Sequence, residues 1–77
     1  MNTQEKIISI VAKQLRISEK DITLDSGIQE DVGADSLDLV EILMAIEAAF
    51  DIVVPDNDAT EMKTIGDLVK YVESKKS

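Results

Sequence analysis

The chain has 77 residues, enough for one small domain, and its sixteen acidic and eight basic residues give a net charge of −8. That charge argues against binding to nucleic acid or to an anionic membrane surface, and it favours a basic protein partner. The absence of cysteine and histidine excludes disulfides, a thiol nucleophile and the commonest general base. We expect residues 1–77 to form a single monomeric domain. Its default location is the cytoplasm, because no signal-peptide pattern and no segment long enough for membrane insertion is present.

The N-terminal segment shows helical spacing of its apolar residues. They recur at steps of three and four residues: Ile7, Ile8 or Ile10, Val11 and Leu15. Asn2 or Thr3 can cap the start of this helix; with Asn2 as the N-cap, Glu5 falls at the third helical position and completes a capping box. The pattern predicts a first helix that begins after Asn2.

A long polar connection follows, from residue 18 to residue 35. Ser18 can start one short turn that ends near Asp21. Apolar residues are spaced to anchor the rest of the connection onto a core: Ile22, Leu24, Ile28 and Val32. A loop of this length in a small domain is uncommon and often functional.

The second predicted helix, residues 36–50, has two apolar faces. A core face with the usual width contains Leu39, Ile42, Leu43, Ile46, Ala49 and Phe50. The outward side carries the apolar residues Leu37, Val40 and Met44, bordered by the acidic residues Asp38, Glu41 and Glu47. One interpretation is that the long connection covers this outward strip. The other is that the strip is a docking surface, in which the acids steer a basic partner and the apolar residues make the contact.

Two further helices are predicted after a weak strand signal in "DIVV", which Pro55 ends. Asp56, Asn57 or Asp58 can cap a short helix. The last helix runs from about Thr64 to Ser74, and Thr64 with Asp67 is a start signal of the capping-box kind. The predicted fold is all-α: a small four-helix bundle of three longer helices and one short one, with a long loop between the first two.

Ser36 stands where the turn at Gly33 becomes the second helix. Asp35 is the predicted N-cap, which makes Ser36 the first helical residue and Asp38 the third. The positive end of a helix favours a phosphate group. Ser36 is not a self-activated nucleophile, because no histidine exists and no lysine lies near it in sequence. The remaining readings are an ordinary serine near a helix start, or a site at which another enzyme attaches a phosphorylated group.

No dedicated metal site is expected. Glu30, Asp35 and Asp38 can gather around the turn, and Glu47 with Asp51 forms another acidic pair. The acids of "DNDATE" lack the glycine and the spacing of an EF-hand, so at most weak, exchangeable cation binding is expected.

The stretch "DVGADSLD", the apolar and acidic helix behind it, and "FDIVVPD" together resemble the acyl carrier protein family. The resemblance covers nearly the whole chain. Asp-Ser-Leu alone is a weak match, and the family-like spacing of further residues strengthens it: Gly33, Asp38, Glu41, Phe50, Pro55 and Asp56.

The resemblance implies a carrier and not an enzyme. In this family the matching serine, here Ser36 after Asp35, receives 4′-phosphopantetheine from coenzyme A, and the thiol of that arm carries acyl groups as thioesters. The implied partners are a phosphopantetheinyl transferase and fatty-acid synthesis enzymes with basic docking patches. These partners would recognise the second helix. The acyl chain of family members can slip between the helices, which here implies the core positions Leu43, Ile46, Phe50, Ile65 and Val72.

The chain departs from the family pattern at some positions, and the resemblance leaves alternative functions open. Ala48 and Ala49 stand where many bacterial relatives place acids. A discrete chain resembles the dissociated fatty-acid synthesis systems. A polyketide, D-alanyl or aminoacyl carrier is the alternative, and a non-covalent acidic helical adaptor is another.

Overall fold

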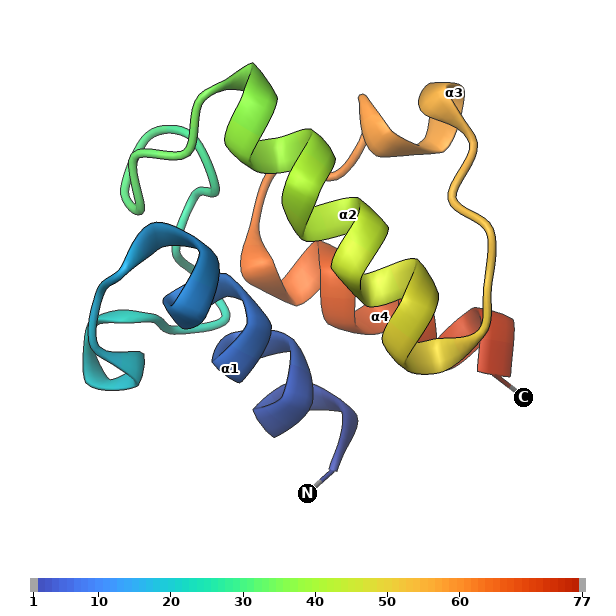
Figure 1. Ribbon diagram of the computed structural model, residues 1–77, viewed down its shortest axis with the longest axis horizontal. Coiled ribbons are helices and arrows are strands. Elements are labelled where there is room, and N and C mark those ends of the chain that lie inside the picture. The colour runs from blue at the N-terminus through green and yellow to red at the C-terminus, as the bar shows by residue number, and fades with distance from the viewer. Residues whose placement is uncertain (1, 77) are drawn as a thin grey trace.

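The structure is a computed structural model that describes residues 2–76. Over these residues the chain forms α1 (Thr3–Leu15), a 3₁₀ turn η1 (Glu19–Asp21), α2 (Ser36–Phe50), α3 (Asp56–Ala59) and α4 (Ile65–Lys76), with no β-strand among them. Figure 1 shows the long connection between α1 and α2 and the isolated short helix α3. The predicted all-α fold of three longer helices and one short one is therefore confirmed.

Capping boxes begin both α1 and α4, as the sequence predicts. The Glu5 N–H donates to Asn2 Oδ1 at 2.8 Å, and the Asn2 N–H donates to Glu5 Oε1 at 3.5 Å. At α4, the Asp67 N–H donates to Thr64 Oγ1, and the Thr64 N–H donates to Asp67 Oδ2, both at 3.1 Å. The backbone N–H groups of Lys63 and Thr64 hold the pKa of the Asp67 carboxyl below its usual value. These reciprocal bonds satisfy N–H groups that a helix start leaves unpaired.

The predicted side-chain cap of α3 is wrong. Pro55 occupies the N-cap position, and no side chain caps this helix. The Pro55 carbonyl itself accepts from the N–H groups of Asp58 and Ala59, both at 3.0 Å. Because the proline ring fixes the backbone just before the turn, the helix begins at Asp56 without an acidic cap. The last helix also extends two residues beyond the predicted Ser74, to Lys76.

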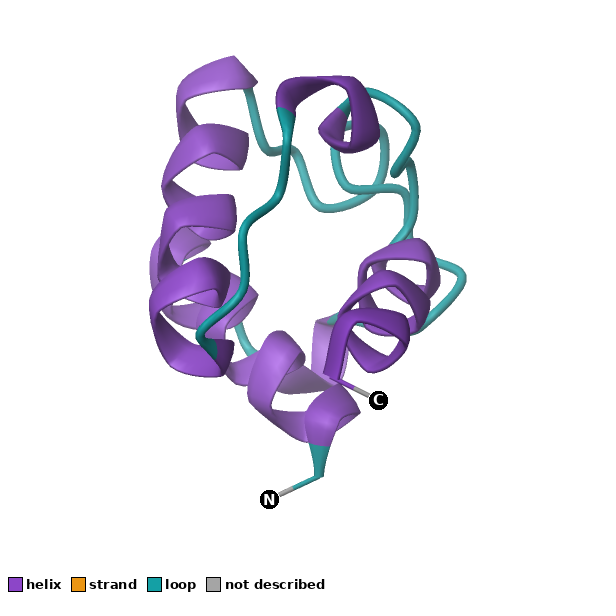
Figure 2. Cartoon of the chain, turned by 90° about the vertical axis from the view of Figure 1, so that its right-hand side faces the viewer, coloured by secondary structure: helices purple, strands orange, loops and turns teal. Residues whose placement is uncertain are grey.

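The core lies where α1, α2 and α4 meet. Its fully buried side chains are Ile7, Val11, Ile28, Ile42, Ile46, Ile65, Leu68 and Val72. Figure 2 shows these helices surrounding the centre of the molecule, with the loop between α2 and α3 running along it from the end of α2 to α3. Two expectations fail: Ala49 is exposed, and Leu24 has 39% of its surface exposed. Ala49 lies at the edge of the core face of α2, where a small angular error places the side chain outside, and Leu24 lies in the long connection, where no helical period fixes the direction of its side chain.

The long connection is fixed to the start of α4 by its backbone. Ile28 N–H donates to the Lys63 carbonyl at 2.8 Å, Ile65 N–H to Ser26 at 3.0 Å, and Gly66 N–H to Leu24 at 2.8 Å. A Cβ at Gly66 would meet the Leu24 carbonyl oxygen at 3.0 Å, so glycine permits this close approach. The connection is therefore an ordered strap that sets the position of the turn before α2.

Candidate functional site

The turn from the long connection into α2 presents Ser36 to solvent. Gly33 has a positive φ of 80°, which turns the chain toward the helix. The Asp38 N–H donates to Asp35 Oδ1 at 2.9 Å, and the Asp35 N–H donates to Asp38 Oδ2 at 3.3 Å. Asp35 is the N-cap and Ser36 is the first helical residue, as predicted. The reciprocal Asp38 bond completes a capping box that the sequence reading did not foresee.

This capping box changes the electrostatics expected at Ser36. The Asp35 carboxylate already accepts from one of the free N–H groups at the start of α2, and two carboxylates flank the exposed hydroxyl. The helix end is therefore less attractive to a free phosphate than the helix dipole alone suggests. All eight lysine and arginine residues lie outside residues 21–62, whereas most of the sixteen acids lie inside this range. The site attracts a basic protein surface more strongly than a free anion.

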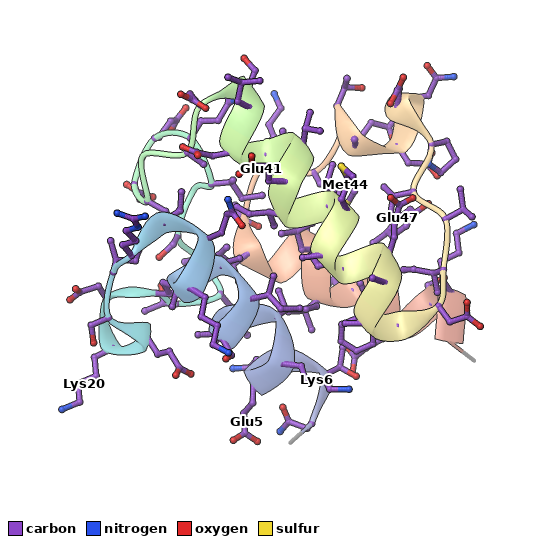
Figure 3. The ribbon with its side chains drawn as sticks, in the orientation of Figure 1. Glu5, Lys6, Lys20, Glu41, Met44 and Glu47 are labelled. Atoms are coloured by element: carbon purple, nitrogen blue, oxygen red, sulfur yellow. The ribbon has the colours of Figure 1, made fainter. Side chains whose placement is uncertain are left out.

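The outward strip of α2 is exposed along its whole length. Leu37 has 76%, Val40 52% and Met44 62% of its surface exposed. The long connection does not cover the strip, so the interpretation that these residues pack beneath it is wrong. Figure 3 shows Met44 projecting from α2 away from α1. An exposed row of large apolar residues on one helix face is typical of a surface that contacts a partner.

The three acids that border the strip have different surroundings. Glu41 is exposed and accepts a hydrogen bond from the Gln14 side chain of α1. Asp38 is half-buried in the capping box. Glu47 is half-buried and points toward the loop between α2 and α3 (Figure 3), where its Oε2 accepts from the Val54 N–H at 2.8 Å. Glu41 is therefore the only one of the three acids whose side chain is exposed to solvent.

Sequence reasoning missed Val53, which has 74% of its surface exposed on the loop between α2 and α3. Its neighbours Ile52 and Val54 are half-buried and pack against the core. This alternation is the period-two pattern of extended backbone, and the "DIVV" run carried that signal. The weak strand signal of this run corresponds to a loop with one apolar side chain facing outward.

The five predicted cavity residues lie in one closed core. Ile46, Ile65 and Val72 are fully buried, whereas Leu43 and Phe50 are half-buried against them. The Lys6 ammonium lies 5.3 Å from the centre of the Phe50 ring, at the edge of this core. The structure thus brings the five together in one packed core.

A pocket of about 520 Å³ opens elsewhere, between the long connection and the segment that joins α3 to α4. Its apolar walls are Ile28, Leu39, Ala59 and Met62, and none of the five predicted cavity residues lines it. Leu39 follows Ser36 by one helical turn on α2, so the pocket begins close to the serine. Met62 was not predicted to be part of the site, because its position depends on the path of the chain after α3.

Two polar contacts hold the α3 region against the bundle. The first is the bond from Val54 to Glu47, and the second is the Tyr71 hydroxyl of α4, which donates to Asp58 Oδ2 at 2.6 Å. The Asp58 hydrogen bond, supported by partial desolvation, raises the pKa of Tyr71 to about 12. No residue of α3 is fully buried, and Ala59 alone of its residues packs against the core, so these polar bonds contribute to fixing this short helix.

The acids do not assemble a metal centre in the part of the chain that the structure describes, where no group of three or more potential ligands is found. Within the same residues, no helix has the length and apolar character needed to cross a membrane.

A small acidic helical bundle that exposes a serine at the start of an outward-facing helix has the form of a carrier for a covalently attached arm. A family model described as the phosphopantetheine attachment site matches residues 5–72. The chain is 50% identical over 72 residues to an acyl carrier protein of Prochlorococcus marinus (strain MIT 9515), a match that covers 94% of this chain and 90% of the relative. A solved structure from Mycobacterium tuberculosis, assigned as an acyl carrier protein, is similar with a TM-score of 0.89 and 32% identity, covering 95% of this chain and 97% of that one.

The chain belongs to the acyl carrier protein family. Members of this family are carriers and not catalysts, and their covalent cofactor is phosphopantetheine. The family as a whole works with a phosphopantetheinyl transferase and with synthesis enzymes. The resemblance seen in the sequence is therefore confirmed.

Proposed function

We propose that Ser36 carries the 4′-phosphopantetheine arm and that the protein delivers acyl intermediates to the enzymes of fatty-acid synthesis. One observation carries the proposal: in a chain of this family, Ser36 is an exposed hydroxyl at the first position of α2, beside its Asp35 cap. Once attached, the arm supplies the thiol that a chain without cysteine lacks. The residues fit this group, because the exposed hydroxyl leaves room for a long substituent and the nearby pocket begins one turn away, at Leu39.

The acidic surroundings of Ser36 indicate that a partner enzyme supplies the groups that attach the arm. No histidine is present to accept the serine proton, and no basic residue occurs between residues 21 and 62. A phosphopantetheinyl transferase supplies the base, and its basic surface complements the acidic surroundings of Ser36. Asp35 acts by fixing the backbone that presents Ser36, since its carboxylate caps the helix.

We infer that fatty-acid synthesis enzymes with basic docking patches read the outward strip of α2. Its apolar members are Leu37, Val40 and Met44, and its exposed acid is Glu41. Asp38 and Glu47, which the sequence also placed on the strip, are half-buried and hydrogen-bonded to the backbone, so we do not assign them a docking charge. The exposure of the three apolar residues supports this role. Exposed acids around an apolar contact area accelerate association with a basic partner, and the apolar contacts slow dissociation.

The acyl chain is proposed to enter the bundle through the pocket beside Leu39 and to extend toward the core. The innermost positions are Leu43, Ile46, Phe50, Ile65 and Val72. Because Ile46, Ile65 and Val72 are fully buried, a long chain has to separate these side chains, whereas a short one fits the pocket of about 520 Å³. We also propose that residues 1–77 act as one carrier domain, which the shared core of α1, α2 and α4 supports. We propose further that this domain is a monomer and works in the cytoplasm.

The test follows the arm and its cargo by intact mass. The protein is incubated with coenzyme A and a phosphopantetheinyl transferase, and then with malonyl-coenzyme A and a malonyl transferase of fatty-acid synthesis. We expect one increase for the arm and a second for the malonyl group, the second removed by hydroxylamine because the link is a thioester. Ser36→Ala should show neither increase. Attachment of the arm without malonyl loading, but with loading of D-alanine by its ligase, would contradict the fatty-acid role.

A further inference from the structure

Glu47 has an unusual number of bonds to the segment that follows α2. Its carbonyl accepts from the N–H groups of Asp51 and, at 3.2 Å, of Ile52. Its carboxylate accepts from the N–H of Val54 at 2.8 Å, in a partly buried position. One residue therefore binds three of the four backbone N–H groups from 51 to 54.

These bonds set the path of the loop. Asp51 ends α2 in the left-handed conformation, with φ 56°, which reverses the chain. The loop then runs back beside α2 toward α3 (Figures 1 and 2). Since Ile52 and Val54 face the core, the side chain of Val53 between them is turned to solvent. The exposure of Val53 is thus a consequence of how the backbone is held, and the Val54 bond is its outermost support.

Glu47 connects the side of α2 that carries Met44 to the loop that carries Val53. Met44 precedes Glu47 by three residues, so the two lie on one side of α2, one turn apart (Figure 3). The Glu47 carboxylate reaches the backbone next to Val53. Both apolar side chains are largely exposed, at 62% for Met44 and 74% for Val53. Ala48, the residue after Glu47, is also exposed and adds no charge to this end of the helix.

We propose, on the basis of the carrier function above, that Glu47 is a positioning residue and not a docking charge. Its carboxylate holds residues 52–54 so that Val53 extends the apolar strip of α2 onto the loop. The surface fits a protein partner with an apolar centre and a basic rim. The rim is argued from the charge distribution, because the range 21–62 that contains this surface has acidic residues and no basic ones.

The two roles of Glu47 are separated by comparing Glu47→Gln with Glu47→Ala. The glutamine side-chain oxygen can accept the same Val54 N–H bond but has no charge, whereas alanine loses both. Two measurements are made on the apo protein: hydrogen exchange of the Val54 amide, and KM and kcat for transfer of the arm by a phosphopantetheinyl transferase. We expect Glu47→Gln to behave like the wild type in both. Glu47→Ala should weaken protection of the Val54 amide about fivefold or more and raise KM by a similar factor with kcat little changed, as expected for loss of one hydrogen bond.

Two control variants test the remaining parts of the proposal. Val53→Ser should raise KM while leaving protection of the Val54 amide unchanged. Glu41→Gln should raise KM at low salt only, because Glu41 is an exposed charge. The proposal is overturned if Glu47→Gln raises KM as much as Glu47→Ala, or if protection of the Val54 amide is equal in all variants. If no variant and no wild-type protein accepts the arm, the carrier function fails, while the exchange of Val54 still reports on the Glu47 bond.

Discussion

At the scale of single residues, the proposed modification site at Ser36 rests on a local arrangement of the backbone. The Asp35 and Asp38 capping box fixes the first turn of α2, and the exposed hydroxyl is the first side chain of that turn. The same two carboxylates make the surroundings acidic, so we expect a basic enzyme surface, and not attraction of the phosphate to the helix end, to govern the proposed modification.

The negative charge of Asp51 lowers the stability of the fold. It lies at the C-terminal end of α2, in the left-handed conformation, and the last turn of this helix contains no basic residue. A negative charge at a helix C-terminus is unfavourable. We expect Asp51→Asn to raise the free energy of unfolding by about 0.3–1 kcal/mol, because asparagine tolerates the same backbone and is neutral. Urea denaturation at low salt checks this, and a variant less stable than the wild type would contradict it.

Tyr71 couples the α3 region to pH. The hydrogen bond to Asp58 raises the pKa of Tyr71 to about 12, above the value of about 10 expected in the unfolded chain. The protonated hydroxyl therefore stabilises the fold fully below pH 10, and this contribution is lost as the pH rises through 12. Since Tyr71 is the single tyrosine and no tryptophan is present, its absorbance near 295 nm reports the pKa directly.

We expect Asp58→Asn to move the pKa of Tyr71 back toward 10. When the pH is raised from 10 to 12, the free energy of unfolding should fall less for Tyr71→Phe than for the wild type. Urea denaturation measures this difference. An absorbance titration of the wild type with a midpoint near 10 would show that the Asp58 bond does not form in solution.

At the scale of elements, α2 combines two roles on opposite faces. Ile42 and Ile46 are completely buried, while Leu37, Val40 and Met44 are exposed. This division allows the outward face to change without loss of the fold, since substitutions at exposed positions usually change stability by about 0.5 kcal/mol or less.

Substitution of a charged residue and substitution of an apolar residue on the outward strip should impair partner binding in different ways. Glu41→Lys is expected to slow association with a ketosynthase and to weaken the salt dependence of binding. Met44→Ala is expected to speed dissociation with little change in the association rate, because it removes short-range packing. Surface-plasmon kinetics beside thermal melts measure both effects. A large loss of stability in Met44→Ala would contradict the exposure of the strip.

The sequence predicted the long elements well because the signals for them are local. The spacing around Ile7 and Val11, the Asn2 and Thr64 caps, and the start of α2 at Ser36 all depend on residues within one or two turns. Val53 and the pocket wall at Met62 were missed, because their positions depend on how the loops return to the bundle. The bond from Val54 to Glu47 crosses the reversal of the chain at Asp51, so neither a continuous helical period nor strand alternation predicts it.

At the scale of the whole molecule, the uneven distribution of charge is the dominant property. Bases are confined to residues before 21 and after 62, and the net charge is −8. Self-repulsion among the acids of the central range weakens the fold at low ionic strength. We expect the melting temperature to rise with added salt, and with millimolar Mg²⁺ or Ca²⁺. A melting curve that stays unchanged across this range would show that the acids are too dispersed to matter.

The central claim is that Ser36, and no other hydroxyl, carries the arm. Trypsin leaves residues 21–63 as one fragment, because no lysine or arginine interrupts it, and this fragment contains both Ser26 and Ser36. Tandem mass spectrometry of that fragment from the modified protein is therefore the most direct test. We predict that the added mass maps to Ser36, that Ser36→Ala abolishes it with helical circular dichroism intact, and that Ser18→Ala, which alters another exposed serine at a helical start, leaves it unchanged. Modification of Ser36→Ala to the same extent as the wild type would contradict the account.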